Sequence, residues 1–146
     1  MNWKKEAENE LRQYSDLCTS LLNIRERIES VKIAMSSIKG SSSSIPVQGG
    51  GNRYEDNLLD LIVEKDRLKA LYRVNSQRVS VIKRGLDALD ENEHKVINRF
   101  YIQNMKYSSA VDCLREEIGY EEAHINRIRN KALYHYTLAE FGLPEL

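Results

Sequence analysis

The sequence predicts an all-α protein, in which a long antiparallel helical hairpin, coiled-coil-like, precedes a group of three short helices. Three observations lead to this prediction. Two long stretches repeat apolar residues at alternating spacings of three and four, a segment rich in glycine and serine separates them, and three shorter amphipathic patterns follow. We therefore expect two domains, a hairpin over residues 1–88 and a helical domain over residues 89–146.

The first long helix is expected over residues 3–38. Its apolar positions form a heptad seam that extends back through Ala7 to Trp3 and is interrupted only at Glu10. A helix of this length measures about 50 Å at 1.5 Å per residue, and its seam requires a partner helix. The central seam residues are Tyr14, Leu17, Leu21, Ile24, Ile28, Val31, Met35 and Ile38.

A loop is expected over residues 39–52. This segment combines glycine and serine with the helix-stopping Pro46. It lacks the Lys-Ser/Thr pair that follows the glycines of a P-loop, and no strand pattern precedes it. The segment therefore predicts a flexible connection and no nucleotide-binding site.

A second heptad seam follows the loop, with polar Lys65 and Asn75 at two of its positions. Because the two seams are similar in length and joined by a short loop, an antiparallel hairpin is the economical arrangement, with the polar positions helping to fix the register. The alternative is that the seams pair between chains, as a dimer or an exchanged hairpin. The apolar seam residues are Tyr54, Leu58, Leu61, Leu68, Tyr72, Val79, Ile82, Leu86 and Leu89.

The second helix is strongly basic over residues 65–84, where a single acid, Asp66, stands against seven cations. These cations suit the backbone of DNA or a negatively charged partner surface. They also suit a solvated face that pairs with first-helix acids such as Glu10, Asp16 and Glu26. Both interpretations stay open. The cations are Lys65, Arg67, Lys69, Arg73, Arg78, Lys83 and Arg84.

Three short helices are expected in the last domain. The first covers residues 91–103 and opens with acids that suit a helix N-terminus. The second begins near Ser108, a good N-cap residue, and ends at Gly119, which can adopt the left-handed conformation. The third covers residues 121–134. Their inward residues are Val96, Ile97, Phe100 and Tyr101, then Ala110, Val111, Leu114 and Ile118, then Ile125, Ile128, Ala132 and Leu133.

The outer face of the third helix is expected to be basic and rich in amides. Residues 123–137 contain Arg127, Arg129 and Lys131 and no acid, which suits a helix that faces phosphates. The alternative is that these cations only complement the C-terminus of the helix. The candidate DNA-binding residues are Glu122, His124, Asn126, Arg127, Arg129, Asn130 and Lys131.

The order of residue types over residues 117–133 resembles the helix-turn-helix of sigma factor region four. Ile118, Gly119, Ile125, Ala132 and Leu133 fall where that family keeps apolar residues and glycine. The preceding helix matches at Leu89, Glu93, Val96, Ile97, Arg99 and Tyr101. In this respect the chain resembles the small sigma-like transcription regulators of bacteriophages and prophages, of the ArpU and RinA kind. It departs from the pattern in a segment between Tyr107 and Gly119 that is about one turn longer, and in Glu121 at the usual capping serine position.

The resemblance implies a phage or prophage transcription regulator that binds double-stranded promoter DNA and docks on the host RNA polymerase. Within the motif, Glu122, His124, Asn126 and Arg127 are expected to meet base edges, and Arg129, Asn130 and Lys131 to meet phosphates. One alternative is a phage DNA-packaging or assembly protein that uses the same motif and a coiled coil. Another is a helical adaptor that does not bind DNA. The chain is also a candidate homo-oligomer.

Composition and chemistry exclude several other classes. Lysine plus arginine equals aspartate plus glutamate at 22 each, so the chain as a whole lacks a basic signature. The scattered His94, His124 and His135 predict no catalytic or metal site, and we expect no enzyme activity and no cofactor. Cys18 and Cys113 predict neither a disulfide nor a zinc site and are expected to be buried. No apolar run spans a bilayer and no signal peptide is evident, so a cytoplasmic location is expected.

Overall fold

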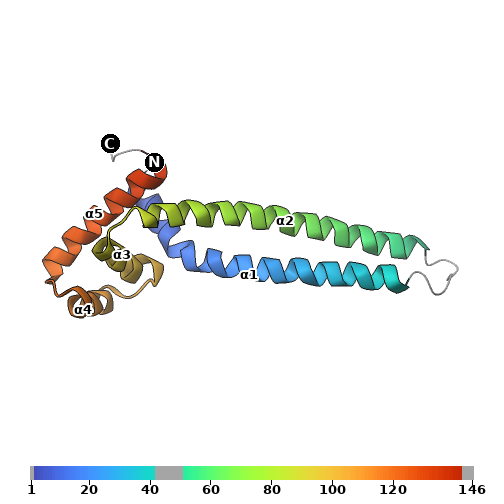
Figure 1. The fold of residues 1–146 in the computed structure, drawn as a ribbon, viewed down its shortest axis with the longest axis horizontal. Coiled ribbons are helices and arrows are strands. Elements are labelled where there is room, and N and C mark those ends of the chain that lie inside the picture. The colour runs from blue at the N-terminus through green and yellow to red at the C-terminus, as the bar shows by residue number, and fades with distance from the viewer. Residues whose placement is uncertain (1, 42–50, 143–146) are drawn as a thin grey trace. The chain divides into compact units, whose positions relative to one another are not determined.

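The protein is all-α, as the sequence predicts. The computed structural model describes residues 2–41 and 51–142, and no strand occurs in these residues. Figure 1 shows the order of the elements along the chain. They are α1 (Trp3–Ser41), α2 (Gly51–Asp87), α3 (Glu91–Ile97), the π-helical turn η1 (Asn98–Ile102), α4 (Tyr107–Ile118) and α5 (Glu122–Phe141).

The two long helices extend further than their seams predict. Residues 39–41 continue α1, and residues 51–52 already belong to α2, so the expectation of a loop over 39–52 is wrong at both ends. Once a helix is nucleated, each further residue adds a backbone hydrogen bond, which favours extension past the last seam position. Residues 42–50, with the rest of the expected loop, lie outside the described residues.

The chain divides into two compact units. Residues 19–77 form unit 2, in which the segments of α1 and α2 lie side by side and run in opposite directions (Figure 1). Ile24 and Leu68 are buried seam residues in this unit. Asn75 donates a hydrogen bond from Nδ2 to Oγ of Ser20 at 3.4 Å. A polar seam position therefore has a polar partner on the facing helix.

Unit 1 comprises residues 1–18 and 78–146 and holds the main hydrophobic core. In it, the first turns of α1 and the last turns of α2 belong with α3, η1, α4 and α5. The expected domain boundary at residue 88 therefore falls inside unit 1. Trp3 packs on Phe141 of α5, with ring centroids 4.9 Å apart. The buried core residues are Ala7, Leu11, Ile82, Leu86, Val96, Ile97, Phe100, Tyr101, Ala110, Val111, Leu114, Ile125, Ala132, Leu133 and Tyr136.

The three short helices begin and end mostly where the sequence indicates. Asp90 and Glu93 form a reciprocal cap at the start of α3, and Gly119 ends α4 with a φ of 73°. Three details differ. The segment expected as one helix over 91–103 changes to a π-helical turn after Ile97, α4 starts at Tyr107 and has no side-chain cap from Ser108, and α5 continues to Phe141.

Tertiary contacts explain these differences. Tyr107 packs on Phe100 with ring centroids 5.8 Å apart, so the start of α4 is fixed by packing and not by a local cap. Tyr136 and Thr137 are buried, which extends the inward face of α5 well past residue 134. In η1, the backbone N–H of Gln103 donates to the carbonyl of Asn98, five residues earlier, at 2.8 Å.

The basic stretch of α2 has few ion-pair partners in the described residues. Arg67 bonds to Glu64 on the same helix, with Nε–Oε2 at 3.0 Å and Nη2–Oε1 at 2.8 Å. The charge of Arg78 acts on the carboxyl group of Glu10. Among the described residues, Glu10 is therefore the one of the three expected first-helix acids that interacts with this stretch.

Candidate nucleic-acid interface

A short turn joins α4 to α5. Gly119, Tyr120 and Glu121 separate the two helices, and the N–H of Gly119 closes α4 by bonding to the carbonyl of Arg115 at 3.0 Å. Glu121 is extended, its side chain makes no cap bond, and its carboxylate lies 3.5 Å from Nη2 of Arg115. This connection has the length typical of a helix-turn-helix.

A hydrogen-bonded network joins the N-terminal ends of α4 and α5. The hydroxyl of Tyr107 donates to Oε1 of Glu122 at 2.7 Å and accepts from Nδ2 of Asn126 at 2.8 Å. Glu122 and Asn126 are one turn apart on α5, so both can reach the same hydroxyl. Two of the candidate DNA-binding residues therefore bond to α4 in the free protein.

Arg129 packs inward, so the expectation that it lies on the outer face of α5 is wrong. Its guanidinium carbon lies 4.6 Å from the centroid of Phe100 and 5.3 Å from that of Tyr101. Its Nε donates to the hydroxyl of Tyr101 at 2.9 Å. Burial raises the pKa of Tyr101, so this hydroxyl stays protonated at neutral pH. The aromatic pair on η1 binds the cation by cation–π contact and a hydrogen bond.

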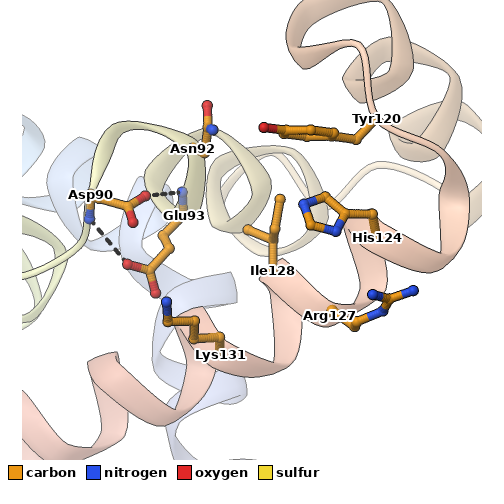
Figure 2. Close-up of a pocket in the computed structure, with 8 residues that line it drawn as sticks. All are labelled: Asp90, Asn92, Glu93, Tyr120, His124, Arg127, Ile128 and Lys131. Carbon is orange, nitrogen blue, oxygen red and sulfur yellow. Dashed lines mark hydrogen bonds between the residues drawn. The ribbon is translucent and has the colours of Figure 1, made fainter.

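His124 and Lys131 line a cleft of about 230 Å³ between the start of α3 and α5 (Figure 2). The ring of His124 contacts that of Tyr120, with centroids 4.2 Å apart. Lys131 extends toward the capping pair, Asp90 and Glu93 (Figure 2). The backbone N–H of Glu93 donates to the carboxylate of Asp90, and this bond holds the pKa of Asp90 below its ordinary value. The charge of Lys131 lowers the same pKa by a smaller amount. A neighbouring carboxylate thus partly offsets the charge of Lys131.

Arg127 and Asn130 are exposed on the outer face of α5, as are Glu122 in its first turn and Lys131 beside the cleft. Arg127 borders the cleft, and its guanidinium extends away from α3 (Figure 2). Tyr134 is exposed seven residues after Arg127, on the same face of the helix. Tyr134 is not among the residues expected from the sequence, although its spacing of four from Asn130 and seven from Arg127 could have indicated it.

The surface around this face is electrostatically divided. The N-cap residue Lys106 and the first-turn residues Ser108 and Ser109 are exposed. Within α4, no acid precedes Asp112. The second half of α4 and the turn after it carry Asp112, Glu116 and Glu121, which line a second hollow with Arg115. A polyanion that lies on the outer face of α5 is therefore favoured at the N-terminal end of α4 and repelled at its C-terminal end.

No metal-binding cluster is found in the described residues. Over residues 2–41 and 51–142, no group of three His, Cys, Asp or Glu side chains is placed to hold a metal ion. Cys18 and Cys113 are unpaired and half-buried, where full burial was expected. Among the helices described, none is long and apolar enough to cross a membrane.

Comparisons with known proteins give no relative. No protein-family model matches the chain, and searches of curated proteins and of solved structures found no significant match.

Proposed function

We propose that this protein binds double-stranded promoter DNA through the outer face of α5 and regulates transcription, as phage and prophage proteins with a sigma region-four-like motif do. The proposal rests mainly on one observation: Arg127 and Asn130 are exposed on the helix that follows a three-residue turn. An arginine and an amide on such a helix can make bidentate contacts with guanine and adenine in the major groove.

The network of Tyr107 with Glu122 and Asn126 supports this orientation. It brings the N-terminal end of α4 next to the N-terminal half of α5, the part of a recognition helix that contacts bases. Lys106, Ser108 and Ser109 then face phosphates at the N-terminus of α4, and Lys131 contacts phosphate near the cleft. Glu122, Asn126 and Arg129 position the two helices. The base contacts then fall to Arg127, as expected from the sequence, and to Asn130, which was expected to meet phosphates.

Binding to DNA can be tested with the full chain. A preferred duplex is first selected from a random-sequence library, and affinity is then compared with that for a scrambled duplex over a range of salt concentrations. Arg127→Ala should weaken binding to the selected duplex by about 1–3 kcal/mol and relax sequence preference. Lys131→Ala should weaken both duplexes alike and reduce the salt slope by about one unit.

A matched control is Arg25→Ala, which removes an exposed cation from α1. It should leave the affinity for both duplexes near the wild-type value. If no duplex is enriched, or if Arg127→Ala, Asn130→Ala and Lys131→Ala all bind like the wild type, α5 is not the reader and an adaptor without DNA contact becomes the better proposal.

The proposed partnership with RNA polymerase has its own readout. Transcription in vitro from a template carrying the selected duplex should change when the protein is added, and the change should be lost in Arg127→Ala. Specific binding without any effect on transcription would instead favour the packaging or assembly role.

A further inference from the structure

The helix α2 carries a second apolar stripe besides its seam. Leu59, Val63 and Val74 are 58%, 60% and 53% exposed, and Ala70 between them is also exposed. At 3.6 residues per turn, these four side chains fall within about 60° of one another, on the side of the helix opposite Leu68. Leu68 is buried in the seam. The stripe therefore lies on the outer face of α2, within unit 2.

The charges of α2 divide sharply at the middle of this stripe. Between residues 53 and 86 all five acids precede Arg67, with Arg53 and Lys65 as the two cations among them, and every charged residue from Arg67 to Arg84 is basic. A parallel pair of such helices would place like charges beside each other, whereas an antiparallel pair places the acidic half of each helix beside the basic half of the other. The acids are Glu55, Asp56, Asp60, Glu64 and Asp66, and the cations that follow include Arg67, Lys69 and Arg73.

The four residues of the stripe are also placed symmetrically about its midpoint. Its midpoint falls between Asp66 and Arg67, so turning a second copy end for end places Leu59 opposite Val74 and Val63 opposite Ala70. At the midpoint, Asp66 of each copy comes within reach of Arg67 of the other. A surface that is complementary to itself in this way is what a twofold dimer requires.

We propose that the outer face of α2 is a dimerisation surface whose partner is a second copy of this chain, paired antiparallel about a twofold axis at residues 66 and 67. The pairing is additional to the seam between α1 and α2, since it uses the opposite side of α2. The apolar contact comprises four small or medium side chains from each copy, which is small for a stable interface, so we expect a weak and reversible dimer.

The outer face of α1 offers a matched control. Leu22 and Ile33 are as exposed as the residues of the stripe, at 63% and 66%. They are eleven residues apart, and the positions between them on that face carry Glu26 and Glu29. The two α1 residues therefore have the exposure of the stripe, but eleven residues separate them, whereas successive residues of the stripe are at most seven apart.

The first test is sedimentation equilibrium of the full chain. The wild type should show a monomer–dimer equilibrium, and Val63→Glu should raise the dissociation constant at least roughly tenfold. Ile33→Glu should leave that constant unchanged. Both positions are exposed, so circular dichroism should show wild-type helicity in both variants. A chain that stays monomeric up to about 1 mM, or a dimer that both variants weaken equally, overturns the proposal.

The second test reports the direction of pairing, in a background with Cys18→Ser and Cys113→Ser. Leu59→Cys and Val74→Cys chains, mixed under mild oxidation, should form a disulfide with each other, because these positions face across the proposed interface. Neither variant should crosslink efficiently alone. Preferential crosslinking of Leu59→Cys with itself indicates a parallel pair and refutes the antiparallel arrangement.

The third test exchanges charges on α2 to ask whether they direct the antiparallel pairing. Around the stripe, Asp56→Lys with Asp60→Lys gives residues 56–66 a net positive charge, like residues 67–77, and Lys69→Glu with Arg73→Glu gives residues 67–77 a net negative charge, like residues 56–66. Each double variant should lose self-association, and an equimolar mixture should recover it as a heterodimer. If each double variant alone dimerises as well as the wild type, the charges do not direct this pairing.

Discussion

Gly85 of α2 lies against the ring of Tyr136 of α5, so closely that a Cβ atom at position 85 would stand 2.6 Å from Cε2 and 2.9 Å from Cδ2. The tyrosine ring is fully buried and belongs to the hydrophobic core of unit 1. A glycine inside a helix normally costs about 1 kcal/mol relative to alanine. Here that cost is offset because glycine permits the close approach of α2 and α5 within unit 1.

We therefore expect Gly85→Ala to destabilise the protein, by about 1–3 kcal/mol, because the ring must move in a packed core. Chemical denaturation followed by circular dichroism measures the change. Ser80→Ala, at an exposed position of the same helix, is the control and should be neutral or slightly stabilising. A Gly85→Ala protein that is more stable than the wild type would show that the ring moves at no cost.

Glu10 of α1 and Glu140 of α5 form a carboxyl pair in unit 1. Burial, together with the neighbouring carboxyl group of Glu140, raises the pKa of Glu10 from 4.5 to about 8, although the charge of Arg78 acts in the opposite sense. Glu6 also raises it. Because the folded chain holds this proton more tightly than the unfolded chain does, the contribution to stability is fully present below pH 4.5 and is lost as the pH rises through about 8.

Glu10→Gln should remove this pH dependence, because the amide resembles the protonated carboxyl group at every pH. Unfolding free energies at about pH 6 and about pH 9 should differ less in the variant than in the wild type. Glu6→Gln, an exposed neighbour, should keep most of the wild-type dependence. If the unfolding free energy of Glu10→Gln depends on pH as strongly as that of the wild type, other groups cause the pH dependence.

Arg129 and Arg127 should behave differently although they are two residues apart. Arg129→Ala removes the cation–π contacts and the hydrogen bond to Tyr101, so it should lower the unfolding free energy by about 1–3 kcal/mol. Arg127→Ala changes an exposed side chain and should stay within about 0.5 kcal/mol of the wild type. Thermal and chemical unfolding of both variants make the comparison. Equal stabilities would contradict the packing role of Arg129.

Arg129→Lys refines this test. Lysine keeps the positive charge but lacks the planar fork that stacks on Phe100 while bonding to the tyrosine hydroxyl. The variant should therefore be destabilised nearly as much as Arg129→Ala. Full recovery of stability by lysine would show that charge alone matters at this position.

The long helices could be predicted from the sequence because their seams repeat over many turns. Periodicity within one helix does not reveal every partner, however. Leu11 is fully buried, yet it lies outside the seam of α1, beside Glu10. The first turns of α1 belong to unit 1, where they pack against elements more than seventy residues later in the chain. That contact has no signature in the local pattern.

The candidate interface was predictable in its position but not in its details. Gly119 and the inward residues Ile125, Ala132 and Leu133 follow local rules, and the structure places them as expected. Arg129 was expected outside because it is charged. Its actual position depends on two aromatic rings from η1, a π-helical turn that the apolar spacing did not indicate. A polar residue is drawn inward when a distant segment supplies aromatic and hydroxyl partners.

Pairing of α1 and α2 within one chain, as opposed to exchange between chains, can be tested at Ser20 and Asn75. These residues are joined by a hydrogen bond of 3.4 Å in unit 2. With Cys18 and Cys113 replaced by serine, a chain carrying Ser20→Cys and Asn75→Cys should form an intramolecular disulfide under mild oxidation. The product should migrate as a monomer on a non-reducing denaturing gel, because the side chains meet within a hairpin.

The control for this experiment is the pair Ser20→Cys and Val74→Cys. Val74 is the neighbour of Asn75 but lies on the exposed face of α2. It should not crosslink to position 20, because successive residues of a helix point about 100° apart. A covalent dimer from the Ser20→Cys and Asn75→Cys chain, formed even at high dilution, would show that the seams pair between chains. Leu68→Asp, which places a charge at a buried seam position, should unfold the hairpin whichever chain supplies the partner.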